Sequence, residues 1–312
     1  MRYFDLHCDT ITRCLEEDLP LWGSGLHVDL EKAGVFSHYV QCYAVWLPDE
    51  LRGEAAYSYF CRAAQRLSQE AQAHRDAMAL CASPEDLEKA QAQGLHGAIL
   101  TVESAAALGG DLSHVKDLKD RGVAMCTLTW NGANEVGRGV GAPGKEGLTP
   151  FGRQAVQAME EAGIVVDLSH ASPELFWEVA DLAKKPIVAS HSNAKAVCSH
   201  RRNLTEEQFR AIKKSGGLVG LNLHRCFLND DPEKACLEDA LRHADYFLSL
   251  GGEDVLALGG DFDGSRPPED LQGLEALPRL CERFLRANYP EDLVDRIFYG
   301  NAARFFAQAR SL

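Results

Sequence analysis

Eight short apolar or β-branched runs recur along the chain, each followed by a polar stretch with a helical pattern. Several of the polar stretches open with Ser, Thr or Pro, which favour the first turn of a helix. This alternation predicts a parallel sheet of βα units, and eight units predict one closed (β/α)8 barrel, a TIM barrel of the α/β class. The expected strands cover residues 3–9, 38–46, 97–102, 123–129, 163–168, 186–190, 217–223 and 254–259.

Two segments depart from the regular alternation. Residues 49–96 are expected to hold one long helix and a second, shorter one, and the glycine-rich residues 131–149 to form a mobile loop over the strand ends. A chain of 312 residues could hold two small domains. No boundary, repeat or low-complexity tract interrupts the pattern, so we expect a single barrel domain over residues 1–312. The expected helices cover residues 55–80, 112–121, 150–162, 173–183, 205–215 and 232–250.

Charge excludes two classes of partner. Acidic residues outnumber basic ones 46 to 32, for a formal net charge of -14, and such a surface repels phosphate backbones and anionic lipid headgroups. We therefore expect no nucleic-acid partner and no membrane partner. The N-terminal residues lack a basic segment followed by an apolar one, and no apolar stretch approaches about 20 residues. These features predict a cytoplasmic protein.

The ten cysteines are scattered, and no C-x-x-C pair occurs among them. Disulfide frameworks are typical of short secreted chains, and structural zinc sites need clustered thiols. The cysteines are therefore expected to be reduced and mostly buried. Any metal should be held by nitrogen and oxygen rather than by sulfur.

Candidate metal ligands lie where the expected strands end, which is where barrel enzymes build their active sites. His7 and Asp9 end the first strand and share one face, because side chains alternate across a strand. An H-x-D pair alone fits a surface histidine and a capping aspartate equally well. However, Glu103 ends the third strand, and His170 and His191 close the consecutive fifth and sixth strands. This set suits Zn, Mn or Co, and a carboxylate can bridge two ions.

Two further acids follow the eighth strand, in the segment Gly260-Asp261-Phe262-Asp263-Gly264. Glycine allows a close approach of the backbone, so the Asp261 carboxylate can project into the mouth of the site. Asp261 is thus a candidate proton carrier. The alternative, a loop aspartate that caps the following turn, fits Asp263 better than Asp261.

The motifs, taken together and in order, resemble the signature segments of the membrane (renal) dipeptidase family. The likeness runs from residue 4 to residue 306 and so spans nearly the whole chain. It implies a zinc-dependent metallohydrolase on a TIM barrel, here a cytoplasmic member of the bacterial type. The matching segments are residues 4–9, 101–103, 166–170, 189–194, 201–203, 260–264 and 300–306.

The resemblance implies a binuclear site with two zinc ions per chain. His7, Asp9 and Glu103 would bind one zinc ion. Glu103, His170 and His191 would bind the second, so that Glu103 bridges the two ions. A water between the ions would become the nucleophile, because two cations lower its pKa and polarise the scissile carbonyl.

The resemblance also implies roles for two residues outside the ligand set. Asp261 would take the proton of the nucleophile and deliver it to the departing amine. Arg202 would hold the terminal carboxylate of the substrate, since a guanidinium can donate two parallel hydrogen bonds to that group. Without the family, Arg201 and Arg202 would be interpreted as an exposed basic pair.

One departure from the family pattern concerns substrate contacts. Well-known members carry a histidine after the Leu-Thr of the fourth strand, and this chain has Trp130 there, followed by Asn131. An indole N–H can donate a hydrogen bond but cannot carry that proton, and Asn131 or Asn134 could supply another donor. His224 follows the seventh strand and is a further candidate for lining the site.

These features predict a metallo-dipeptidase that removes the N-terminal residue of small dipeptides, including those with a D-residue at the C-terminal position. The alternative within enzymes is a related amidohydrolase acting on an N-acyl amino acid or another small amide. A phosphoesterase would need several basic residues at the site, where only Arg202 qualifies. A non-catalytic binding protein would have no use for Asp261. A homodimer is implied by the family alone.

Overall fold

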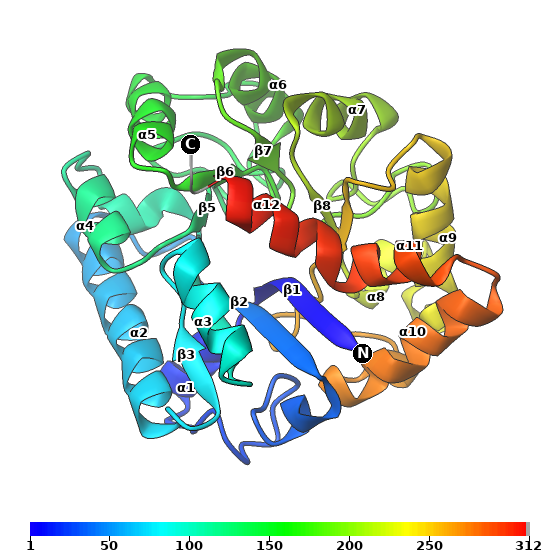
Figure 1. Cartoon of the computed structure of the whole chain (residues 1–312). Coiled ribbons are helices and arrows are strands. Elements are labelled where there is room, and N and C mark those ends of the chain that lie inside the picture. Colours follow the sequence, from blue (N-terminus) through cyan, green and yellow to red (C-terminus); the bar gives the residue numbers. More distant parts are fainter. Residues whose placement is uncertain (310–312) are drawn as a thin grey trace.

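The computed structural model describes residues 1–309 and confirms the (β/α)8 barrel (Figure 1). Within those residues, eight parallel strands lie side by side in the order β7-β6-β5-β4-β2-β1-β9-β8. A parallel bridge between Ala189 and Val219 joins the two ends of that order and closes the ring. The strands are β1 (Arg2–Cys8), β2 (His38–Trp46), β4 (His96–Glu103), β5 (Met125–Thr127), β6 (Val165–Asp167), β7 (Ile187–Val188), β8 (Val219–Leu221) and β9 (Leu256–Leu258).

Helices surround the ring of strands, and several begin where the sequence pattern indicated. Thr149, Ser172 and Thr205 each accept a hydrogen bond from a backbone N–H of the first helical turn, which fixes the starts of α5, α6 and α7. No helix in the described part of the chain is long and apolar enough to cross a membrane. The helices between β4 and β9 are α4 (His114–Asp120), α5 (Pro150–Glu161), α6 (Pro173–Leu182), α7 (Glu206–Ser215), α8 (Arg225–Leu228) and α9 (Leu237–Ser249).

The helix predicted over residues 55–80 is wrong at its C-terminal end. Helix α2 (Gly53–Ala73) stops earlier, and the chain then forms a ninth strand, β3 (Met78–Leu80), which pairs with the N-terminal half of β4. Met-Ala-Leu has a good helical propensity, but pairing with a distant strand overrides it. The shorter second helix is confirmed as α3 (Pro84–Ala92), which a capping box between Ser83 and Asp86 initiates.

The helix predicted over residues 232–250 also starts too early. Residues Pro232–Lys234 form only a short 3-10 turn, and α9 begins at Leu237. Asp239 accepts the backbone N–H of Cys236, which is extended, and this contact sets the later start. The proline that suggested a helix start therefore opens a separate turn.

The interior of the barrel is closed at one end by the C-terminal helices. Phe305 and Phe306 of α12 (Asn301–Ala309) pack into a cluster with Phe4, Ile99 and Val165, which belong to different strands. Figure 1 shows α12 lying across the ring of strands. Helices α10 (Leu277–Arg286) and α11 (Glu291–Asp295) and a π-helical turn (Arg296–Gly300) lead into α12. The opposite end, where the strands have their carboxyl termini, remains for a site.

Candidate metal centre

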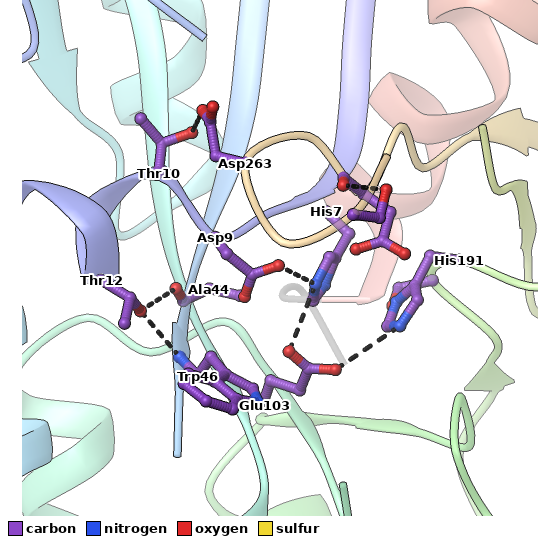
Figure 2. Close-up of polar contacts among 12 residues, drawn as sticks. His7, Asp9, Thr10, Thr12, Ala44, Trp46, Glu103, His191 and Asp263 are labelled. Carbon is purple, nitrogen blue, oxygen red and sulfur yellow. Dashed lines mark hydrogen bonds and ion pairs between the residues drawn. The ribbon is translucent and has the colours of Figure 1, made fainter. Parts of the chain in front are cut away.

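Five side chains predicted as metal ligands meet at the carboxyl ends of four strands. Nε2 of His7 lies 3.5 Å from Oδ2 of Asp9 and 3.5 Å from Oε2 of Glu103. The other oxygen of Glu103, Oε1, lies 2.8 Å from Nε2 of His170 and 3.6 Å from Nε2 of His191. Figure 2 shows the Glu103 carboxylate between His7 and His191. The two oxygens of one carboxylate thus face two different groups of ligands.

The donor set fits a divalent metal. His7 Nε2 and Asp9 Oδ1 are buried and have no hydrogen-bond partner among residues 1–309. Ligand atoms of His7, Glu103 and His191 all lie within 4.8 Å of one another, as do those of His7, Asp9 and Asp261. Buried polar atoms without partners are costly unless a cation or a ligand satisfies them. Imidazole and carboxylate donors at such spacing suit Zn, Mn or Co.

The electrostatics of the site also favour a bound cation. Burial, together with the charge of Asp9, raises the pKa of Glu103 to about 8 and that of Asp261 to about 6. Burial lowers the pKa of His170 and His191 well below the usual range, which keeps their lone pairs available. Burial opposes a charge on His7, yet the neighbouring Glu103 and Asp9 raise the pKa of His7 well above its usual range, so positive charge is favoured beside these two carboxylates.

Asp261 lies with the candidate ligands, and the nearby Asp263 does not. Oδ2 of Asp261 accepts a hydrogen bond of 2.8 Å from Nδ2 of Asn222 at the end of β8. The Asp263 carboxylate accepts hydrogen bonds from Thr10 Oγ1 and from the backbone N–H groups of His27 and Val28. The carboxylate therefore contacts the start of helix α1 (Thr10–Glu16) and the loop near residue 27, so the prediction that Asp263 caps the turn that follows it is wrong.

Arg201 and Arg202 lie in opposite environments. The side chain of Arg201 is exposed, whereas Arg202 is only 5% exposed. Arg202 donates to the carbonyl oxygen of His191 at 3.2 Å and to Oγ of Ser192 at 3.4 Å, and its guanidinium lies over the ring of Phe227. Desolvation lowers its pKa to about 10, so it stays charged at neutral pH. Its Nε has no partner among the described residues.

A cleft of about 350 Å³ opens over the ligands, within the usual size range for small-molecule sites. The indoles of Trp130 and Trp46 meet edge to face there, with ring centroids 5.1 Å apart. Asn131 lines the cleft, and its Oδ1 lies 3.0 Å from Nδ1 of His170. His224 also lines the cleft, and its Nδ1 is 3.1 Å from the carbonyl oxygen of Arg266. Trp130, Asn131 and His224 therefore border the cleft, whereas the fourth predicted substrate contact, Arg202, lines a second hollow on the other side of His170.

The comparison with protein families settles the assignment. The family model for membrane dipeptidase, peptidase family M19, matches residues 1–312. The chain belongs to this family. It is accordingly a metallo-dipeptidase, a metal-dependent hydrolase of peptide bonds.

Relatives of this family member include curated and solved proteins. An uncharacterized protein in the pqqA 5' region of Klebsiella pneumoniae is 35% identical over 234 residues, which are 72% of this chain and 86% of the relative. The crystal structure of dipeptidase AC, a metallo peptidase of family M19, has a TM-score of 0.93 and 29% identity, covering 100% of this chain and 99% of the other. A metallo peptidase from Rhodobacter sphaeroides, liganded with a phosphinate mimic of the dipeptide L-Ala-D-Ala, has a TM-score of 0.92 and 28% identity, with 99% of each chain covered.

Two site residues of this dipeptidase adopt a backbone conformation that is uncommon outside glycine. His170 has a φ of 67° and Asp261 a φ of 57°, both in the left-handed region. The carbonyl oxygen of His170 accepts from Val140 N, and Asp261 N donates to the carbonyl oxygen of His7. Such conformations persist where the surroundings impose them, often at active sites. The segment of Val140 and strand β1 thus hold these two side chains toward the candidate metal centre.

A β-bulge aims His7 into the site. Phe4 and Leu6 both point into the barrel interior, so regular alternation would turn His7 outward. The register between β1 and β2 shifts between Asp5 and Cys8, and the bulge brings His7 to the inner side. Oδ1 of Asp5 accepts the backbone N–H of His7 at 3.2 Å and that of Gly260 at 2.7 Å, which ties the bulge to the segment of Asp261.

Sequence reasoning missed Asp5, Asp167 and Asn222 as parts of this site. Asp167 repeats the geometry of Asp5, since its Oδ1 accepts the backbone N–H groups of Ser169 and Ser190. Both aspartates are fully buried within apolar strands. A lone acid in an apolar run, two residues before His7 in one case and three residues before His170 in the other, is the signal that could have found them. For Asn222 the sequence carries no comparable signal.

Proposed function

We propose that this metallo-dipeptidase uses two zinc ions to hydrolyse the peptide bond of small dipeptides, including those with a D-residue at the C-terminal position. The observation that supports it best is the position of Glu103. One carboxylate oxygen faces His7, and the other faces His170 and His191. That arrangement suits a bridging ligand, with His7 and Asp9 on one side and the two histidines on the other.

Zinc in this centre would polarise the scissile carbonyl and lower the pKa of a water between the ions, and the protein would move the protons. Asp261 is the group for that task. Its carboxyl is buried beside His7 and Asp9, and its pKa of about 6 lies near neutrality. It would take a proton from the attacking water and deliver it to the departing amine. The hydrogen bond from Asn222 fixes its orientation.

The substrate carboxylate would bind to Arg202. This guanidinium is buried, charged and next to the ligand His191. Its uncommitted Nε and its position over Phe227, which lines the cleft, fit an anionic group entering from the cleft. Trp46 and Trp130 would form an apolar wall for the rest of a small substrate.

Support for an L,D-substrate comes from the Rhodobacter sphaeroides metallo peptidase, whose ligand mimics L-Ala-D-Ala. The test is turnover of a panel of L,L- and L,D-dipeptides by zinc-loaded protein, by chelator-treated protein and by treated protein resupplied with zinc. We expect cleavage that chelation abolishes and zinc restores. Each dipeptide should be paired with its N-acetylated form. Equal turnover of the two forms would favour the amidohydrolase of N-acyl amino acids, and full activity after chelation with no residual zinc would contradict the proposal.

A further inference from the structure

Asp167, at the end of β6, is the acceptor of four hydrogen bonds although it is fully buried. Its Oδ1 accepts the backbone N–H groups of Ser169 and Ser190, both at 2.9 Å. Its Oδ2 accepts the hydroxyls of Thr127 at 2.6 Å and Ser190 at 2.5 Å. The carboxylate thus links β5, β6 and the segment that follows β7. It contacts none of the five candidate ligands directly but lies one residue away from His191 along a hydrogen-bond chain.

The chain continues from Ser190 to His191. Oγ of Ser190 lies 2.7 Å from Nδ1 of His191. A serine hydroxyl has one proton, and the carboxylate of Asp167 at 2.5 Å is an acceptor only, so that proton goes to Asp167. Ser190 Oγ must then accept from His191, and the imidazole carries its proton on Nδ1. Nε2, which faces Glu103 and His170, keeps its lone pair.

We propose that Asp167 is a positioning residue that acts through Ser190 to hold His191 in the tautomer that can bind a metal. This inference rests on the proposed metal centre. Partners that fix the tautomer and orientation of a metal-binding histidine tune its affinity for the metal. His170 has a shorter arrangement of the same kind, because Oδ1 of Asn131 contacts its Nδ1 directly.

Another hydroxyl lies close to this chain. Oγ of Ser169 is 3.3 Å from Oγ of Ser190, and it accepts the backbone N–H of His191 at 3.1 Å. Ser169 can therefore give its own proton to Ser190, which has two lone pairs. It leaves the direction of the chain from His191 to Asp167 unchanged.

The Asp167→Asn variant should reverse the direction of the hydrogen bonds between residue 167, Ser190 and His191. Two backbone N–H groups point at the Oδ1 position, so the amide must place its carbonyl oxygen there and its NH₂ at the Oδ2 position. The NH₂ then donates to Ser190, and the hydroxyl of Ser190 donates to Nδ1 of His191. The proton of His191 moves to Nε2, which blocks the ligand atom. Zinc affinity should fall by about 10 to 100-fold.

The Ser190→Ala variant separates this role from a merely structural one. It removes the hydrogen bonds that link Asp167 to His191, so neither tautomer of His191 is favoured. Zinc affinity should therefore fall less than in Asp167→Asn. The double variant combines Asp167→Asn with Ser190→Ala. Without the Ser190 hydroxyl, the amide at position 167 no longer affects the tautomer of His191, so zinc affinity should recover to the level of Ser190→Ala alone. Thr127→Val is the matched control, because Thr127 donates to the same oxygen of Asp167 without contacting His191. It should leave zinc affinity unchanged.

Zinc affinity is measured by competition with a chromophoric chelator, and thermal unfolding checks that each variant folds. Additive losses in the double variant, or wild-type affinity in Asp167→Asn, would overturn the proposal. ¹⁵N NMR of metal-free protein labelled with ¹⁵N-histidine reports the tautomer of His191 in the absence of zinc. The His191 proton should lie on Nδ1 in the wild type and on Nε2 in Asp167→Asn, and the same tautomer in both would overturn the proposal. Failure of the wild type to bind zinc would contradict the proposed function instead.

Discussion

Nε2 of His170 and Nε2 of His191 lie 3.0 Å apart, and both side chains are buried, His191 completely and His170 beneath the cleft. At that distance at most one proton fits between the two nitrogens, so at least one nitrogen keeps a lone pair. Burial disfavours protonation of either ring and lowers the pKa of both. The pair is therefore better suited to share a metal ion than a proton.

The first prediction concerns metal content. We expect zinc-loaded, desalted protein to retain about two zinc ions per chain, because the donors form one set on each side of Glu103. Glu103→Gln should lower that number and abolish turnover. Metal analysis of both proteins is the measurement. Full activity of the wild type at one zinc ion or fewer would refute the binuclear site.

The second prediction concerns Asp261. Asp261→Asn should retain the zinc ions, and the oxygen of the new amide can still accept the hydrogen bond from Asn222. Turnover should nevertheless fall by about 100 to 10,000-fold, which is the usual contribution of a general acid-base group. Steady-state kinetics and zinc content should be measured on the same preparation. Turnover within about threefold of the wild type would assign the proton transfer to another group.

The third prediction uses the contrast between Arg202 and Arg201. Arg202→Met should sharply lower kcat/KM for free dipeptides, since each lost charge-assisted hydrogen bond costs about 1.5 to 3 kcal/mol. The exposed Arg201 is the matched control, and Arg201→Met should have little effect. On a dipeptide amide, which has no carboxylate, the penalty for Arg202→Met should shrink. Equal penalties on acid and amide would mean that Arg202 supports the site generally.

The fourth prediction concerns pH and metal removal. Burial raises the pKa of Glu103 to about 8 in the folded, metal-free protein, above its ordinary value of 4.5, so the folded state holds that proton more tightly than the unfolded state. The free energy by which the Glu103 proton stabilises the folded state is fully present below about pH 4.5 and is lost as the pH rises through about 8.

The lowered pKa values of His170 and His191 make the folded state more stable as the pH rises, but this gain is complete above their ordinary value of 6.5. Between about pH 7 and 9 the raised pKa values of Glu103 and of its neighbour His7 act in the same direction, so the melting temperature of metal-free protein should fall as the pH rises. Glu103→Gln should flatten the fall, and zinc should suppress it. A melting temperature of the metal-free protein that is constant or rises over this range would contradict the expectation.

The fifth prediction concerns the space beside Asp9. A Cβ at Gly264 would lie 1.8 Å from Oδ2 of Asp9, so Gly264→Ala must displace this candidate ligand. We expect weaker binding of one zinc ion and a loss of turnover with the fold retained. A Cβ at Gly34 would meet no atom of the described residues within 4 Å, so Gly34→Ala is the matched control. Unchanged zinc affinity in Gly264→Ala would exclude Asp9 as a ligand.

Much of the fold and of the ligand set could be predicted from the sequence, because both depend on local patterns. Eight apolar runs separated by helical segments indicate parallel strands, and a barrel places all their carboxyl ends at one edge. His7, Glu103, His170 and His191 end such runs, so the prediction that they meet needed no coordinates. The family motifs then assigned the substrate-binding role to Arg202 and not to Arg201, a distinction that composition could not provide.

The tertiary structure alone decided features that depend on contacts between distant residues. The bulge that turns His7 inward arises from a register shift against β2, and β3 exists because residues near 78 meet β4. The links from Asp167 through Ser190 and from Asn222 to Asp261 join residues on different strands. Local periodicity determines which face a residue occupies, whereas hydrogen-bond partners across strands depend on register, and register is set only when the whole barrel closes.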